Sequence, residues 1–261
     1  MTTKPFNWKI FFILLGAATW GVIAITPYSL ALQNTDALKA LPIPLEVLIP
    51  LQWIQNAVMF AIVIGIGLFL ANRTGLGLPI LEAKLAGEPV GEQVKAILPI
   101  SIILGVVGSV LIIVIDVFVF SPLLTAELGD KAATLAQAQP AAWKGLLASF
   151  YGGITEEVLL RLFVMTLLVW LGKFVSHTED GRPTAAVLWI ANILAAVLFG
   201  LGHLPATAAV MPITTLVVIR AILLNGVIGV ACGYLYAKRG LESAMISHFA
   251  ADIVLHVLLA L

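Results

Sequence analysis

The sequence contains few charged residues and almost no cysteine. Asp, Glu, Lys and Arg make up only 11% of the 261 residues, too little charge to cover the surface of a soluble domain. Basic and acidic residues balance at 14 each, so the basic footprint of a nucleic-acid-binding protein is absent. Cys232 is the only cysteine, which excludes an internal disulfide and a zinc site built from cysteines.

Hydrophobic residues take the place of the missing charges. They make up 61% of the chain, and the mean hydropathy is +1.09. A spanning helix needs about 20 mainly apolar residues. The sequence predicts an all-α polytopic integral membrane protein with about seven transmembrane helices, an eighth helix being the alternative, in one membrane domain over residues 1–261. The predicted spans are 10–32, 45–71, 96–120, 145–171, 184–203, 213–237 and 241–261.

The distribution of basic residues over the breaks between spans predicts the orientation. Loops on the cytoplasmic side of a membrane carry an excess of Lys and Arg. An N-terminus in the cytoplasm puts nine basic residues inside, namely Lys4, Lys9, Arg73, Lys84, Lys95, Lys173, Arg182, Lys238 and Arg239. It leaves three outside, namely Lys39, Lys131 and Lys144. The break 72–95 mixes apolar and charged residues, a composition that suits the membrane interface, and a further break is predicted at 121–144.

The span 145–171 carries an unusual group of charges in the stretch "GGITEEVLLR". Glu157 and Arg161 are four residues apart, so they share a helical face and can pair directly. Glu156 is rotated by about 100° from Glu157 and cannot easily reach the same partner. One charge at the bilayer centre costs about 2.5–3.5 kcal/mol on insertion scales, so these residues need a partner or a function. A structural ion pair without chemistry is the alternative.

Further polar residues lie in the later spans. His203 ends the span 184–203, after two glycines that permit close approach of another helix. In the last span, His248, Asp252 and His256 recur every four residues and therefore form one stripe. Ionisable residues within spans normally face the protein interior or a cavity.

Other intramembrane polar residues have open roles. Asp116 and Arg220 can pair with each other or with the cluster of Glu156 and its neighbours. Asn225 is expected to be a polar tie between helices. His256 lies near the chain end and can also reach the outer interface.

The usual protease signatures are missing from this chain. It has no H-E-x-x-H, no G-x-S-x-G and no cysteine nucleophile beside a histidine. The remaining set of Glu, Arg, His and Asp side chains could activate water for hydrolysis, bind a metal or relay protons.

Three short motifs resemble one known family. "EEVLLR" (156–161) fits E-E-x-x-x-R, "FGLGH" (199–203) fits F-x-x-x-H, and "HFAAD" (248–252) fits H-x-x-x-N/D. In this order they resemble the CPBP family of intramembrane proteases. That family includes the type II CAAX prenyl endopeptidases and bacteriocin-processing or immunity proteins, also described as Abi-like. The resemblance covers roughly residues 143–258, which would form the CAAX-protease-like catalytic core.

The resemblance implies an intramembrane endopeptidase that cuts membrane-associated protein or peptide substrates. Glu156 would be the general base on a water molecule, and His203 would hold that water. Glu157 would pair with Arg161, and His248 would stabilise the oxyanion.

The last motif position departs from the family pattern. The family often has asparagine there, which can donate a hydrogen bond. Asp252 can donate only when protonated, so it is expected to orient His248 instead.

The resemblance leaves the cofactor open. Glu156, His203 and His248 could supply a zinc ligand set with water in the fourth position. These ligands come singly from three helices, which favours a water activated by Glu and His without a metal.

The resemblance also implies an environment and a geometry. The protein is expected in the plasma membrane of a prokaryote, with the bilayer and a protein substrate as partners and no nucleic acid. With straight helices, His203 lies at the outer end of its span and His248 about 10 Å above the inner end of its own. Their convergence with Glu156 on one polar cavity therefore requires a shifted, tilted or broken helix.

Two rival functions fit the same residues. A membrane adaptor or immunity-type protein would keep the motifs for structure alone. A proton-coupled transporter would use Glu156, Arg220 and Asp116 as a relay. Transporters often show inverted repeats and paired broken helices, and the sequence shows no repeat.

Overall fold

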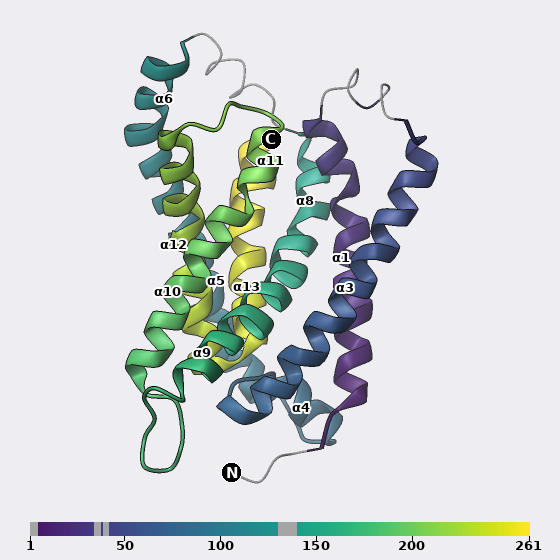
Figure 1. The fold of residues 1–261 in the computed structure, drawn as a ribbon, viewed down its shortest axis with the longest axis vertical. Coiled ribbons are helices and arrows are strands. Elements are labelled where there is room, and N and C mark those ends of the chain that lie inside the picture. Colours follow the sequence, from purple (N-terminus) through teal and green to yellow (C-terminus); the bar gives the residue numbers. More distant parts are fainter. Residues whose placement is uncertain (1–4, 34–37, 39–41, 130–139) are drawn as a thin grey trace.

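The chain forms a bundle of long helices in a computed structural model (Figure 1). The structure describes residues 5–33, 38, 42–129 and 140–261. Within these ranges the regular elements are all helical, apart from one isolated β-bridge between His177 and Pro183. The prediction of an all-α polytopic membrane protein is confirmed.

Six helical segments in the described part of the chain are long and apolar enough to cross a membrane. Three of them are single uninterrupted helices, namely α1 (Trp8–Leu32), α3 (Leu45–Thr74) and α12 (Thr215–Arg239). The other three are composite. They comprise α5 (Gly91–Ile115) with η1 (Asp116–Phe120) and α6 (Ser121–Leu128), α10 (Ala185–Gly202) with α11 (Leu204–Ala208), and α13 (Leu241–Asp252) with η4 (Ile253–Val257) and η5 (Leu258–Ala260).

The predicted span 145–171 is also helical but has a different internal geometry. It comprises α8 (Ala142–Phe150), η2 (Tyr151–Glu156), η3 (Val158–Met165) and α9 (Thr166–Gly172). Both η2 and η3 are π-helical. A π-helical turn holds one extra residue, is rare, and often occurs at functional sites. The unusual backbone therefore coincides with the stretch that carries Glu156, Glu157 and Arg161.

The predicted break at 121–144 is wrong at its start. Helix continues through η1 into α6 and ends only at Leu128. Proline lacks the N–H that an interior helical position donates, but it fits the first turn after a change of helical geometry. Pro122 occupies this position, directly after the π-helical turn. The break 72–95 contains the short helix α4 (Pro79–Leu85).

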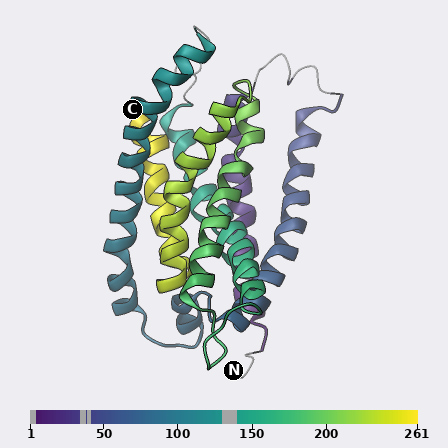
Figure 2. The ribbon, with the colours of Figure 1, turned by 60° about the vertical axis from the view of Figure 1, so that its left-hand side comes forward.

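The helices form two neighbouring groups that meet at the predicted fourth span. α12 lies against α10, α13 and α5, whereas α1 packs on α3, α8 and η2. Figure 2 shows α5 and α3 at opposite edges, with the later helices between them. α1 begins at one end of the bundle, and the chain ends at the other end, after η5 (Figure 1).

The C-terminal helix docks closely on α8 at a glycine. A Cβ added to Gly145 would meet the backbone carbonyl of His256. Gly145→Ala is therefore expected to destabilise the protein by about 1–3 kcal/mol, the usual effect of overpacking a tight contact. The measurement is the melting temperature of the purified protein in detergent.

Gly16→Ala is the matched control for this prediction. Gly16 also lies within a helix, but nothing is within 4 Å of a Cβ added there. Alanine favours a helix over glycine by about 0.5–1 kcal/mol, so this variant should melt at the wild-type temperature or above. Equal melting temperatures for the two variants would contradict the close docking.

Candidate active site

Glu157 lies between the two π-helical segments and forms the buried anchor of the site. Its Oε1 accepts a hydrogen bond of 2.8 Å from His248 Nδ1 and lies 3.3 Å from an Arg161 guanidinium nitrogen. All three side chains are buried. Arg161 also donates a hydrogen bond of 2.8 Å to the carbonyl of Gly229, which connects η3 to α12. The pair of Glu157 and Arg161 is thus present, and His248 is a further partner that the sequence did not indicate.

Glu156 faces the opposite nitrogen of the same histidine. Its Oε2 lies 3.7 Å from His248 Nε2, and its Oε1 lies 4.0 Å from His203 Nε2. The Glu156 side chain is 18% exposed, whereas that of Glu157 is fully buried. The two adjacent carboxylates are therefore unequal, because one is locked in an ion pair and the other faces a partly open space.

The two histidines direct the same ring atom towards Glu156. His203 Nδ1 lies 2.9 Å from the Phe199 carbonyl. A carbonyl only accepts, so this nitrogen carries the hydrogen and Nε2 has an open lone pair. His248 Nδ1 is occupied in the same way by Glu157. Fixing one ring nitrogen orients the other, as second-shell partners do at metal and catalytic sites.

Phe199 contacts every aromatic and cationic member of the cluster. Its ring centroid lies 4.7 Å from that of His203, 5.4 Å from that of His248 and 5.3 Å from the Arg161 guanidinium carbon. Such edge-on contacts and cation–π contacts hold side chains in place. The F-x-x-x-H spacing indicated that Phe199 matters, but only the structure reveals these contacts.

His203 reaches the cluster although its position in the chain predicted a different depth. It lies at the C-terminal cap of α10, which crosses the bundle obliquely before α11 begins (Figure 1). The structure therefore brings Glu156, His203 and His248 together through a tilted helix. The structure gives the positions of these three side chains, whereas their catalytic roles stay predictions.

Asp252 approaches His248 from the side opposite Glu157. Its Oδ1 lies 3.7 Å from His248 Nε2 and 3.9 Å from His256 Nε2. A Cβ added to Gly152 would meet the Asp252 carboxylate, so the glycine in η2 makes room for this side chain. The sequence suggested one stripe for the three residues of the last span, and the structure places them in sequence along it.

The space around Glu156 fits either a water molecule or a metal ion. Separations of 3.7 and 4.0 Å exceed hydrogen-bond distance, so the carboxylate and the imidazoles are not bonded directly, and one shared atom placed beside them can contact all three. Zinc bonds of about 2.0–2.2 Å put tetrahedral ligand atoms roughly 3.3 Å apart. Small side-chain movements would bring these residues to that spacing. The donor set of one carboxylate and two open Nε2 atoms suits zinc.

A second grouping of potential ligands lies deeper. Ligand atoms of Glu157, Cys232 and His248 lie within 4.8 Å of one another. The single cysteine therefore lies close to the cluster, which the sequence did not indicate, although a zinc site built from cysteines stays excluded. However, most of these ligand atoms already have partners. Glu157 Oε1 binds His248 Nδ1, and the Cys232 thiol donates to the Ala244 carbonyl at 3.6 Å. The grouping is less suited to a metal than the Nε2 side.

The remaining intramembrane charges do not join the cluster. Arg220 donates two hydrogen bonds to Asp116, of 2.6 and 2.7 Å, in a bidentate pair between α12 and η1. The expectation for Asn225 is wrong, because its amide donates to the Ala221 carbonyl within the same helix. Asn192 of α10 connects two helices instead, because its side-chain amide donates a hydrogen bond to the backbone carbonyl of Val230 in α12.

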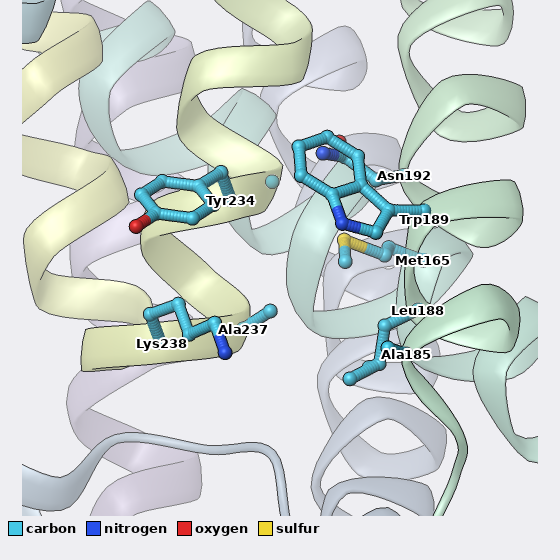
Figure 3. A pocket seen from close by; sticks show the side chains of 9 residues that line it. Met165, Ala185, Leu188, Trp189, Asn192, Tyr234, Ala237 and Lys238 are labelled. Atoms are coloured by element: carbon cyan, nitrogen blue, oxygen red, sulfur yellow. The ribbon is translucent and has the colours of Figure 1, made fainter.

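Two cavities lie outside the cluster. A pocket of about 40 Å³ between α10 and α12 is lined by apolar atoms around Trp189 and Tyr234 (Figure 3). A larger groove of about 410 Å³ lies among α1, α4, η2 and α13. Ile154 lines this groove and belongs to the same π-helical turn as Glu156.

The fold and the site define a polytopic helical membrane protein with a cluster of glutamate, histidine and arginine inside its bundle. Residues 138–254 match the family described as type II CAAX prenyl endopeptidase Rce1-like. This match confirms the resemblance to the CPBP family and includes all three motifs. It supports an intramembrane endopeptidase of the CAAX-protease kind. No curated protein and no solved structure matches the chain.

Proposed function

We propose that the protein hydrolyses peptide bonds of membrane-associated proteins with a water molecule activated by Glu156 and two histidines. The observation that carries this proposal is the convergence of His203 Nε2 and His248 Nε2 on the Glu156 carboxylate. A general base must lie within reach of its proton, directly or through one water. The gaps of 3.7 and 4.0 Å provide that position.

The geometry assigns a role to each group around the water. One hydrogen of the water points to Glu156, and the other points to the open lone pair of His203. Glu156 accepts a proton while the water oxygen attacks the scissile carbonyl carbon. His248 acts in its charged form, in which Nδ1 donates to Glu157 and Nε2 also carries a hydrogen that it donates to the oxyanion that forms. Glu156 then returns the proton to the leaving amine nitrogen, and the carbon–nitrogen bond breaks.

Glu157, Arg161 and Asp252 act through other residues. Glu157 holds His248 through Nδ1, and Arg161 neutralises Glu157 in the bundle interior. Asp252 lies against His248 at 3.7 Å and limits its rotation. Since His248 is held from both sides, its Nε2 is preorganised for the developing charge.

The apolar groove beside η2 supports a membrane-associated substrate. Its lining is apolar except for Lys84 and Glu242. Residues two positions apart on a helix point to nearly opposite faces, so the groove that Ile154 lines lies on the other side of η2 from the Glu156 carboxylate. A hydrophobic anchor segment of the substrate is proposed to bind in this groove, with the scissile peptide reaching the site around η2. The catalytic core is proposed to cover residues 143–258, with the N-terminus in the cytoplasm of a prokaryote and the groove at the inner side.

Zinc hydrolysis is the second candidate. It is favoured by the two Nε2 atoms whose Nδ1 partners are already fixed. Glu156, His203 and His248 would hold the ion, which would polarise the carbonyl and acidify water. A purified protein treated with a strong chelator decides between the two. We expect cleavage to persist, whereas a loss that zinc restores would establish the metal.

The rival functions have less support. A proton relay through Asp116 and Arg220 is disfavoured because these residues are paired with each other. An adaptor would need only the buried pair of Glu157 and Arg161, which leaves no reason for Glu156 to face two histidines.

The experiment that tests the proposal is comparative proteomics of membrane fractions. Cells with wild-type protein are compared with cells in which Glu156→Ala replaces it. A precursor that accumulates uncleaved in the variant, and that purified wild-type protein then cleaves, would identify the substrate. If no precursor accumulates and the purified protein cleaves no membrane-fraction protein, the endopeptidase proposal is wrong.

A further inference from the structure

Tyr28 and His256 lie outside the three motifs, yet they continue the polar cluster away from Glu156. The Tyr28 hydroxyl lies 3.2 Å from His256 Nδ1, and their rings meet edge to face at 5.5 Å. The opposite nitrogen of His256 lies 3.9 Å from Asp252 Oδ1. A chain of four side chains thus runs from Tyr28 through His256 and Asp252 to His248.

We propose that His256, anchored by Tyr28, is a positioning residue that holds the Asp252 carboxylate against His248. The inference rests on the proposed function, because it assigns His256 a part in preparing the same site. His256 touches neither Glu156 nor the expected place of the water. It acts only through Asp252.

Asp252 needs such a support because of its surroundings. The residue is buried, and its carboxylate forms no side-chain hydrogen bond within the part of the chain that the structure describes. The imidazoles of His248 and His256 lie at nearly equal distances of 3.7 and 3.9 Å from the same oxygen of Asp252. A buried carboxylate without a firm partner can turn, and the second imidazole opposes a turn away from His248.

The backbone explains how His256, whose side chain is 37% exposed, still reaches Asp252 and Tyr28. The π-helical turn η4 contains His256 and is pressed on Gly145 of α8. Tyr28 approaches from α1, which also packs on α8. The contact with α8 therefore holds the backbone at His256, and Tyr28 of α1 gives the imidazole a hydroxyl partner at Nδ1. An interfacial histidine in contact with solvent alone would need none of these contacts.

The first test compares kinetics on the precursor that proteomics identifies. His256→Gln and Tyr28→Phe should lower kcat about tenfold, as removal of second-shell partners does, with KM changed less than twofold. The matched controls are His177→Gln in an exposed loop and Tyr234→Phe on α12, far from the cluster. Both controls should keep wild-type kinetics. A change in KM alone would show that His256 contributes to substrate binding and would overturn the proposal.

A double variant tests whether His256 acts through Asp252. In the Asp252→Asn background, His256→Gln should cause no further loss of kcat, because residues that act in one chain are not additive. Independent losses that multiply would place His256 outside this chain. Melting temperatures of all variants show whether the fold is retained.

A spectroscopic measurement tests the inference without a cleavage assay. The chain has only four histidines, so ¹⁵N-labelled imidazoles of the purified protein give few signals, assignable by single substitutions. His256→Gln should shift the ring signals of His248 in the wild-type background and leave them unchanged in the Asp252→Asn background. Tyr28→Phe should shift the His256 signals, whereas Tyr234→Phe should not.

The outcomes separate the two proposals. If the wild-type protein cleaves nothing while the His248 signals respond as expected, the proposed function fails and the link from His256 to His248 stands. If cleavage depends on Glu156 but neither kcat nor the His248 signals respond to His256→Gln, the positioning role is wrong. Unchanged His248 signals in a folded His256→Gln protein are sufficient to reject it.

Discussion

Cleavage is expected to fall by about 10²–10⁴-fold when Glu156 is replaced by Gln, the usual contribution of a general base. Glutamine keeps the size of the side chain but cannot take a proton from water. The fold should survive, because Glu156 has no partner within hydrogen-bond distance among the described residues and is partly exposed. The measurement is the rate of precursor cleavage by purified protein beside its melting curve.

The control for this prediction is a carboxylate outside the cluster. Glu92→Gln removes one charge at the exposed start of α5, where Glu92 pairs with Lys95 at 2.8 Å. This variant should cleave and melt like wild type, since exposed pairs contribute about 0–1 kcal/mol. Full cleavage by Glu156→Gln would remove Glu156 from the role of base.

Glu157→Gln is expected to destabilise the folded protein by roughly 3–5 kcal/mol, the loss found when one partner of a buried ion pair is removed. Among the described residues, Arg161 would then remain buried with the Gly229 carbonyl as its one hydrogen-bond acceptor. His248 would also lose its charged acceptor. Activity should fall together with stability, so yield, melting temperature and cleavage are measured on the same preparation.

The double variant Glu157→Gln with Arg161→Met separates charge from shape. Removing both charges and keeping an extended apolar side chain should recover part of the stability, because the unpaired cation is gone. Activity should stay low, since His248 would still lack its carboxylate. If Glu157→Gln alone were as stable and active as wild type while Glu156→Gln unfolded, the roles of the two glutamates would be exchanged.

Most of the fold could be predicted from the sequence because membrane spans depend on local composition. Runs of about 20 apolar residues give helices wherever they occur in a bilayer. The end of α6 was missed because Pro122 normally marks a break, but here it directly follows a π-helical turn. The π-helical geometry of η2 and η3 has no sequence signal of this kind, since it depends on packing between helices.

The sequence predicts those contacts of the candidate site that depend on residue spacing within one helix. It does not predict the contacts that depend on how one helix is tilted against another. Glu157 and Arg161 share a face at four residues, so their pair could be read from one helix. The meeting of His203 with Glu156 requires the oblique course of α10, which single-helix periodicity does not contain. Tyr28 has no sequence signal that links it to His256, because the two residues are 228 positions apart along the chain.

The bidentate pair of Asp116 and Arg220 has a consequence for how the chain is made. The two residues are 104 positions apart, so at 5–20 residues per second the ribosome adds Arg220 on the order of 5–20 s after Asp116. During that interval α5 must enter the bilayer with an uncompensated carboxyl group. Among the candidate spans in the described ranges, this segment has the highest mean hydropathy, 2.9. Its surplus of apolar residues lets the insertion machinery release it before its counter-ion has been synthesised.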